Sequence, residues 1–249
     1  MVHSPDSTPP ISRRAALAAL PFLGVVSLGA CSSGADSRKD EAKPSGSKAP
    51  TPKQRLQATK KVMDASSGMH LTLTSKGVPD SATGVIKGEG DGGPAPAFKG
   101  TLTAAIAGTQ ADVPVVAVDG KVWAKLPIWP DMRTVQPKDY GAPDPALLFS
   151  REKGISSLLP KTKNPKFGAE RRDGNDVVRV ITGELIGTDV VATFSLGNPG
   201  LKYDVTYLVT SKNELRSAAL RGVFFNDATT TYTLRLDEYG KKIDVQPPA

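Results

Sequence analysis

The stretch from residue 98 to residue 126 reads FKGTLTAAIAGTQADVPVVAVDGKVWAKL, and it decides the fold class. Leu102 and Ile106 lie on one side of a period-two alternation, which is typical of a β-strand with one buried face. The dipeptide Asp119-Gly120 then separates two β-rich runs, which is a strong short-range signal of a hairpin. We therefore expect consecutive antiparallel strands at 98–107, 112–118 and 121–126.

Similar runs flank this stretch on both sides, with turn dipeptides between them. The further expected strands are 69–74, 83–89, 176–183, 203–209, 215–223, 229–237 and 242–246. Residues 52–67 repeat apolar side chains at helical spacing, and 143–160 predicts two short helices separated by Gly154. Residues 184–201 fit a helix or a strand equally well. The expected class is α+β, mostly β, in a single domain.

The composition agrees with many short strands and turns and excludes several kinds of site. The 249 residues include 24 Gly, 21 Pro, two His and a single Cys, Cys31. One Cys allows no internal disulfide and no Cys-based zinc or iron–sulfur site, so we expect neither a metal nor a cofactor. The net charge is +7, but no long run of bases with interleaved aromatics occurs, so we expect no nucleic-acid partner.

The N-terminus is typical of an exported lipoprotein. Residues 15–30 are uncharged and mostly apolar after Arg13-Arg14, but they are too few to span a bilayer of about 30 Å as a helix. Residues 28–31, Leu-Gly-Ala-Cys, resemble a lipobox, whose Cys carries a diacylglycerol with acyl chains such as palmitate. We therefore expect a signal peptide over 1–30 and a lipid attached to Cys31. The arginine pair fits a twin-arginine signal and a plain basic n-region equally well.

A tether follows the expected attachment site. Residues 32–52 contain no Val, Ile, Leu, Met or aromatic residue, so they cannot form a core. A flexible chain of this length spans about 25 Å between its ends. We expect 31–52 to be a lipidated Cys and flexible tether, and 53–249 to be a domain held at the extracytoplasmic face of the plasma membrane.

Three segments together resemble a known family. They are 119–126 (DGKVWAKL), the run from Tyr140 to Leu159, and Asp173-Gly174 followed by the strand of Val177–Val180. In order and spacing they are similar to the actinobacterial lipoproteins typified by LppX, LprG, LprA and LprF, over essentially all of 55–249. The resemblance implies a single strongly bent antiparallel sheet, a half-barrel, with short helices on its concave side around an apolar cavity.

The same resemblance implies a function. It implies a carrier without chemistry of its own, which holds multi-acylated phospholipids, glycolipids or lipoglycans and moves them from the plasma membrane into the envelope, in some cases beside a lipid exporter. A bound acylated lipid is therefore expected. The candidates for the cavity lining are Leu71, Leu73, Ile86, Leu102, Ala104, Ile106, Val116, Val118, Trp123, Leu148, Leu158, Leu159 and Val180. The alternative is a non-catalytic envelope scaffold whose helices fill the concave side completely.

The sequence gives little support for an enzymatic function. Ser/His/Asp catalysis needs a histidine between nucleophile and acid, and His70 lies on the expected wet face of a strand. Residues 88–93 (GEGDGG) contain G-x-G-x-x-G, but Pro94 follows where a dinucleotide site needs a helix, so we expect a loop. Asp119 and Asp131 can form a carboxylate pair, yet a turn and a proline-containing loop explain them. A lipid hydrolase is therefore the least favoured alternative.

Overall fold

The structure is a computed structural model that describes residues 49–106, 108–225 and 228–248, with Ile106 described by its backbone alone. The expected signal peptide, lipobox and most of the tether, including Cys31, lie outside the described residues and stay predictions. Within residues 49–248, the described helices include none that is both long and apolar enough to cross a membrane.

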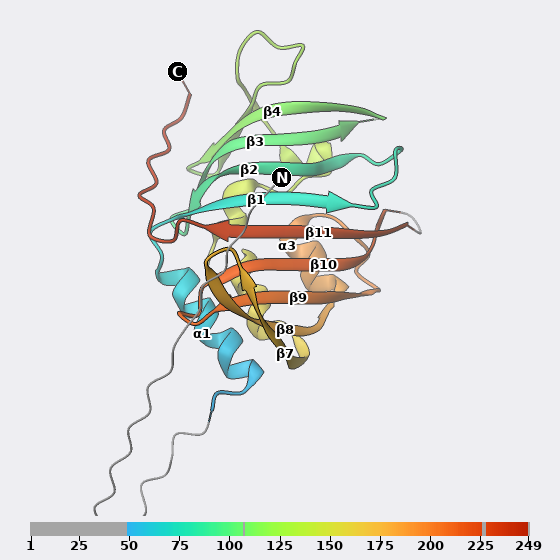
Figure 1. Cartoon of the computed structure of the whole chain (residues 1–249). Coiled ribbons are helices and arrows are strands. Elements are labelled where there is room, and N and C mark those ends of the chain that lie inside the picture. Colours follow the sequence, from blue (N-terminus) through green and yellow to red (C-terminus); the bar gives the residue numbers. More distant parts are fainter. Residues whose placement is uncertain (1–48, 107, 226–227, 249) are drawn as a thin grey trace, which may run out of the picture. The chain divides into compact units, whose positions relative to one another are not determined.

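One antiparallel sheet of eleven strands forms the body of the described chain (Figure 1). Its order is β6-β5-β4-β3-β2-β1-β11-β10-β9-β8-β7. The first meander contains β1 (Met69–Lys76), β2 (Gly84–Gly93), β3 (Ala97–Ile106), β4 (Thr109–Val118), β5 (Lys121–Ala124) and β6 (Arg133–Val135). The second contains β7 (Lys163–Asp173), β8 (Asp176–Ile186), β9 (Lys202–Thr210), β10 (Leu215–Phe225) and β11 (Ala228–Asp237). The two meanders meet where β1 pairs with β11, so the sheet is bent but not closed into a barrel. The mostly-β half-barrel expected from the sequence is confirmed.

The helical segments lie on one face of this sheet, which we call the inner face (Figure 1). They are α1 (Pro52–Ala65), the 3₁₀ turns η1 (Pro137–Tyr140) and η2 (Pro145–Phe149), α2 (Ile155–Leu158), η3 (Leu159–Lys161) and α3 (Gly187–Phe194). Helix α1 starts with a capping box in which the Gln54 amide nitrogen donates to Thr51 Oγ1 at 3.3 Å and the Thr51 nitrogen donates to Gln54 Oε1 at 2.8 Å. It buries Leu56 and Met63 against the core.

The segment 184–201, which fits helix or strand by sequence, contains helix α3. Two contacts hold together the two ends of this connection between β8 and β9. The Gly187 nitrogen donates to the Leu201 carbonyl at 2.7 Å, and a Cβ on Gly187 would lie 2.1 Å from the Asn198 carbonyl oxygen. Ser195 takes a left-handed conformation that ends the helix. Burial of Val190 on the inner face outweighs the local β-propensity of the β-branched residues.

Two sequence expectations about strands are wrong, and two strands of the structure were not expected. Residues 242–246 form no strand because both neighbours of β11 in the sheet, β1 and β10, are already paired to it. Residues 88–93 belong to strand β2, and the turn lies after them at 94–96. Strands β6 and β7 were not expected. Strand β7 is a polar edge strand with two register shifts, so it shows no clean alternation.

The tip of the β7–β8 hairpin folds over the outer face of the sheet. Asp173 and Asp176 flank its turn, and they form ion pairs with Arg235 of β11 and Arg216 of β10. Because the order β8-β9-β10-β11 separates these strands, the hairpin must cross the outer face to reach them. Apolar side chains of β8 on this face are thereby covered, and Val178 is fully buried.

The hydrophobic core is complete within the described chain. Its buried members run from Leu56 to Leu236 and come from both meanders and from the helices on the inner face. Residues 48–249 form one compact unit, so we treat the chain from residue 49 onward as a unit that folds on its own.

Candidate functional site

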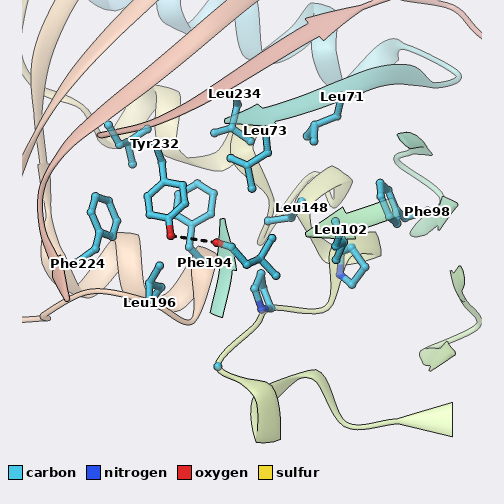
Figure 2. Close-up of a pocket in the computed structure, with 15 residues that line it drawn as sticks. Leu71, Leu73, Phe98, Leu102, Leu148, Phe194, Leu196, Phe224, Tyr232 and Leu234 are labelled. Atoms are coloured by element: carbon cyan, nitrogen blue, oxygen red, sulfur yellow. Dashed lines mark hydrogen bonds between the residues drawn. The ribbon is translucent and has the colours of Figure 1, made fainter. Parts of the chain in front are cut away.

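An apolar cavity lies on the inner face where the two meanders meet. It encloses about 770 Å³ of space free of protein atoms, part of which is open to solvent. Figure 2 shows its side chains converging from the sheet and from the helical segments. The lining residues are Leu71, Leu73, Val85, Phe98, Leu102, Gly141, Pro143, Pro145, Leu148, Phe194, Leu196, Leu220, Phe224, Tyr232 and Leu234.

Strand register brings the sheet part of this lining together. Leu73 of β1 lies directly opposite Leu234 of β11, and Leu71 lies opposite Leu236. Partners in an antiparallel pair share a face, so this row of leucines projects to the inner side across the junction of the meanders. Leu220 and Tyr232, which are paired between β10 and β11, extend the row.

Strand β2 contributes a surface without side chains. Gly88, Gly90 and Gly92 occupy its alternate, inner-face positions. A Cβ on Gly90 would lie 2.6 Å from Phe98 Cζ, and one on Gly92 would lie 2.3 Å from Phe149 Cε2, so both positions require glycine. The rings of Phe98 and Phe149 therefore stack against the strand, with centroids 6.2 Å apart. The glycine-rich run thus makes room for aromatic packing beside the cavity.

A second apolar cavity adjoins the first on the side of β3–β6. It holds about 550 Å³ of space free of protein atoms, part of it open to solvent. Val85, Leu102, Pro143 and Pro145 line both cavities. The other lining residues of the second cavity are Ala104, Val113, Val115, Val122, Ala124, Leu126, Val135, Pro137, Tyr140 and Ala142. Leu102 therefore borders both cavities, and we consider the two cavities together as one site.

One polar contact crosses the main cavity. The Tyr232 hydroxyl donates to the Val85 carbonyl at 3.0 Å (Figure 2). Strand β1 pairs with β2 only as far as Leu73 and Gly88, so the start of β2 diverges from β1. The Val85 carbonyl therefore has no hydrogen-bond donor on β1, and the Tyr232 hydroxyl supplies one. Burial raises the pKa of Tyr232, which keeps its hydroxyl protonated.

A carboxyl lies between Pro143 and Pro145, two residues that line both cavities. Asp144 caps the 3₁₀ turn η2, with the Ala146 amide nitrogen donating to its Oδ1 at 2.9 Å. Burial raises the pKa of Asp144, although hydrogen bonds from the backbone of Ala146 and Leu147 partly oppose this. The site as a whole is a large apolar volume with a few fixed polar groups, which suits acyl chains better than a polar ligand.

Comparison with known proteins identifies the family of this chain. Residues 51–245 match the family model described as LppX_LprAFG lipoprotein. The chain belongs to this lipoprotein family. The resemblance seen in the sequence is confirmed.

Two solved structures share the fold of this LppX_LprAFG lipoprotein. LprF from Mycobacterium bovis is 14% identical, with a TM-score of 0.64 over 80% of this chain and 97% of LprF. LppX from Mycobacterium tuberculosis is also 14% identical, with a TM-score of 0.57 over 78% of this chain and 98% of LppX. No curated protein matches the sequence at a significant level.

The structure of this LppX_LprAFG member brings five of the candidate residues to the cavities. Leu71, Leu73, Leu102 and Leu148 line the main cavity, and Ala104 and Leu102 line the second. The side chain of Ile106 lies outside the described residues, although β3 ends at this position.

Four candidates lie on the outer face instead. Val116 and Val118 alternate with Val115 and Ala117, and only the latter pair belongs to the core of the inner face. Trp123 lies opposite Val116 on the outer side, and Val180 likewise alternates with the inner-face Ile181. The expectation for these four is wrong because both parities of β4 and β8 are apolar, and alternation then cannot say which face is inner.

Ile86, Leu158 and Leu159 are buried but line neither cavity. The register of β2 against β3 shifts between Val85 and Lys87, and this bulge places Val85 at the cavity in place of Ile86. Leu158 and Leu159 belong to α2 and η3, which pack against α1. They fill the space between helices and do not reach the cavity.

Sequence analysis missed most of the lining from the second meander. Tyr232 and Leu234 lie on an expected strand that alternates cleanly, so their parity relative to Leu73 could have identified them, and Leu220 is paired with Tyr232. Phe194 and Leu196 could not be placed, because their segment fitted helix and strand equally. Phe98 was hidden by the glycine run that it packs against.

The single described histidine lies away from the cavity. His70 Nδ1 is 2.8 Å from Asp91 Oδ1 on the outer side of β1 and β2, and Lys241 Nζ is 2.9 Å from the same carboxylate. Burial alone would raise the pKa of Asp91, but the hydrogen bonds from His70 and Lys241 lower it. In the described part of the chain, no group of three or more His, Cys, Asp and Glu side chains is arranged to hold a metal ion.

Proposed function

We propose that this lipoprotein is a membrane-anchored carrier that binds multi-acylated lipids or lipoglycans and moves them from the plasma membrane into the cell envelope. The observation that supports this most directly is the unfilled apolar space on the inner face, about 770 Å³ beside a second volume of about 550 Å³. Two adjoining apolar spaces suit a ligand with more than one acyl chain. The lining offers a single side-chain hydroxyl, that of Tyr232, within the main cavity.

The membrane anchor is part of this proposal. A lipidated Cys31 and the apolar-free segment 32–52 would hold the domain on the extracytoplasmic face of the plasma membrane. Replacing Cys31 by Ala should release the protein into the medium or leave it unprocessed. Membrane attachment of the Cys31→Ala protein at unchanged mass would contradict the anchor.

The alternative is an envelope scaffold with no ligand. A scaffold has no use for an open apolar space, and a packed interior is the usual state of a protein core. Catalysis forms no part of the proposal, because Tyr232, whose side chain is the one polar side chain lining the main cavity, donates its hydroxyl to a backbone carbonyl.

Lipid extraction tests the carrier proposal. The chain from residue 32 onward is purified from an actinobacterial host, extracted with organic solvent and analysed by mass spectrometry. We expect about one acylated lipid per chain. A protein that carries no lipid under these conditions, and takes up none from added lipid, supports the scaffold instead.

A variant at Leu102 links any extracted lipid to the cavity. Leu102→Trp adds an indole to the residue that lies between the two cavities, and we expect it to remove the bound lipid while the protein stays folded. Thr101→Trp is the matched control, since Thr101 is the next residue of the same strand and points to the opposite face. Lipid retained by Leu102→Trp, or lost equally from both variants, would place the ligand elsewhere.

A further inference from the structure

The loop between β5 and β6 carries the most exposed large apolar side chain of the described chain. Ile128 is 85% exposed, whereas the next most exposed large apolar residue, Val177, is 48% exposed. The neighbouring residues are also apolar, and the loop from Leu126 to Met132 reads LPIWPDM. In Figure 1 the chain beyond β4 rises above the edge of the sheet as a yellow-green loop. Single exposed apolar residues are common on protein surfaces, but here several adjoin one another, and contiguous exposed apolar side chains mark protein or membrane contact sites.

Local contacts give the loop a defined shape. The Trp129 nitrogen donates to the Leu126 carbonyl at 2.9 Å, which closes a turn around Ile128. The Arg133 guanidinium lies 5.4 Å from the centre of the Trp129 ring, a cation–π distance. Pro127 and Pro130 restrict the backbone on either side of the turn. The isoleucine is thus presented on a turn that is already ordered.

The same loop is continuous with the second cavity. Leu126 at its start and Val135 of β6 both line that cavity. Lining residues and the exposed tip are therefore two and seven residues apart on one hairpin. Any external surface that Ile128 contacts therefore lies close to the wall of the second cavity.

The charges around the tip favour an anionic surface. Residues 121–140 contain four bases, Lys121, Lys125, Arg133 and Lys138, against two acids, Asp131 and Asp139. Lys125 and Arg133 directly flank the tip, and both are exposed. Basic residues near an anionic membrane surface each strengthen attachment, and Trp and Arg side chains suit the headgroup region.

We propose that the tip of the β5–β6 hairpin, Leu126–Met132, inserts Ile128 and Trp129 into the headgroup region of an anionic phospholipid bilayer. A protein partner is less suited to this feature, because a stable interface needs roughly 800 Å² from each side and this tip is a single turn. A tether of 21 residues can extend to about 70 Å, which lets the domain turn the hairpin toward its own membrane. The proposal deepens the carrier function, since docking brings the second cavity to the lipid surface.

Trp129 provides the readout. In the chain from residue 32 onward with Trp123→Phe, Trp129 is the remaining tryptophan. Added vesicles of phosphatidylglycerol and phosphatidylcholine should shift its emission to the blue, and nitroxide-labelled lipids in the bilayer should quench it. High salt and vesicles of phosphatidylcholine alone should weaken both effects.

Two variants separate tip insertion from general stickiness. Ile128→Asp should weaken vesicle binding at least about tenfold, because it removes an aliphatic group that the bilayer would bury and puts a charge in its place. Val177→Asp is the matched control, as an exposed apolar residue on the β7–β8 hairpin at the other edge of the sheet, and it should bind as the parent does. Equal vesicle binding by Ile128→Asp and the parent would overturn the proposal, and so would equal weakening by Val177→Asp.

Leu102→Trp separates this docking from lipid carriage. Because Leu102→Trp adds a tryptophan, its vesicle binding is measured by co-sedimentation. The blocked cavity should leave this binding unchanged, so its loss in Leu102→Trp would mean that vesicle binding reports lipid uptake and would overturn docking by the tip. A parent protein that binds vesicles through Ile128 but yields no extractable lipid would overturn the carrier function alone. Binding to no vesicle of either composition would overturn docking alone.

Discussion

The two meanders of the sheet differ in how their inner faces are covered. Among the largest side chains that are less than 2% exposed, the inner face of β7–β11 supplies Tyr203, Tyr207, Ile181, Leu185, Leu215, Leu236 and Val205. The strands β1–β6 supply only Phe98 to that described set. Away from the main cavity, the second meander is therefore packed like an ordinary core, and the first meander is less tightly packed.

The difference follows from where the helices lie. Helix α3 packs on β8 and β9, and α1 packs on β7 and on the short helices α2 and η3. On the other meander the 3₁₀ turn η2 contacts β2, β3 and β4, and the loop around Pro143 completes the cover. One half thus supplies the stability of the domain, and the other half can leave space for a ligand without losing the fold.

The largest expected effect compares a truncation in each half. Leu185→Ala should lower the free energy of unfolding by about 2–5 kcal/mol, because Leu185 is fully buried among packed neighbours. Leu102→Ala should cost less, since Leu102 borders open space on two sides and has fewer contacts to lose. Urea unfolding of the chain from residue 32 measures both values. Equal losses in the two variants would mean that the first meander is as tightly packed as the second.

Alkaline pH should weaken the packed half next. Burial raises the pKa values of Tyr207, Tyr232 and Tyr239, and all three belong to β9, β11 or the residues just after β11. The folded state then keeps protons that the unfolded state releases above a pKa of about 10, so stability is complete below that pH and falls as pH rises.

Each such tyrosine should contribute a slope of about 1.4 kcal/mol per pH unit above pH 10. Unfolding free energies measured across this range should therefore fall, and Tyr207→Phe should remove one group's share of the slope. A slope that does not change in Tyr207→Phe would show that the Tyr207 hydroxyl, which lies 2.9 Å from Thr162 Oγ1, titrates normally in the folded protein.

The sequence was most informative where one face of a strand is apolar and the other polar. Leu71, Leu73 and Leu102 alternate with polar or small residues, and all three line the main cavity. On β4, Val113 to Val118 is apolar on both parities because each face is covered, so the residues chosen there, Val116 and Val118, fell on the wrong side.

Other parts of the site depend on tertiary contacts that a local pattern does not contain. Val85 reaches the cavity in place of Ile86 because of a bulge in β2, and Phe194 arrives there on a helix of β-branched residues. The run Gly88–Gly93 has a sequence like that of a phosphate-binding loop, yet its inner-face glycines at 90 and 92 are required by the rings of Phe98 and Phe149. Each of these features is decided by a neighbour that is distant in the chain.

The smallest expected effect concerns the seam between the two halves. Tyr232 of the packed half donates across diverging strands to the Val85 carbonyl of the open half. Tyr232→Phe keeps the ring, which packs edge-on against Phe224, and removes this one hydrogen bond. We expect a loss of about 0.5–1.5 kcal/mol, the usual contribution of such a bond.

The location of the loss is more informative than its size. If the bond ties the start of β2 to the second meander, amide hydrogen exchange in Tyr232→Phe should speed up at Val85–Lys87 and stay unchanged in β9 and β10. Tyr239→Phe is the matched control, because the Tyr239 hydroxyl donates at 2.8 Å to the Leu215 carbonyl within the packed half. Faster exchange throughout β9–β11 in Tyr232→Phe, with no change at Val85–Lys87, would show that this hydroxyl stabilises the packed half alone. The start of β2, which forms part of the cavity wall, would then not depend on this hydrogen bond.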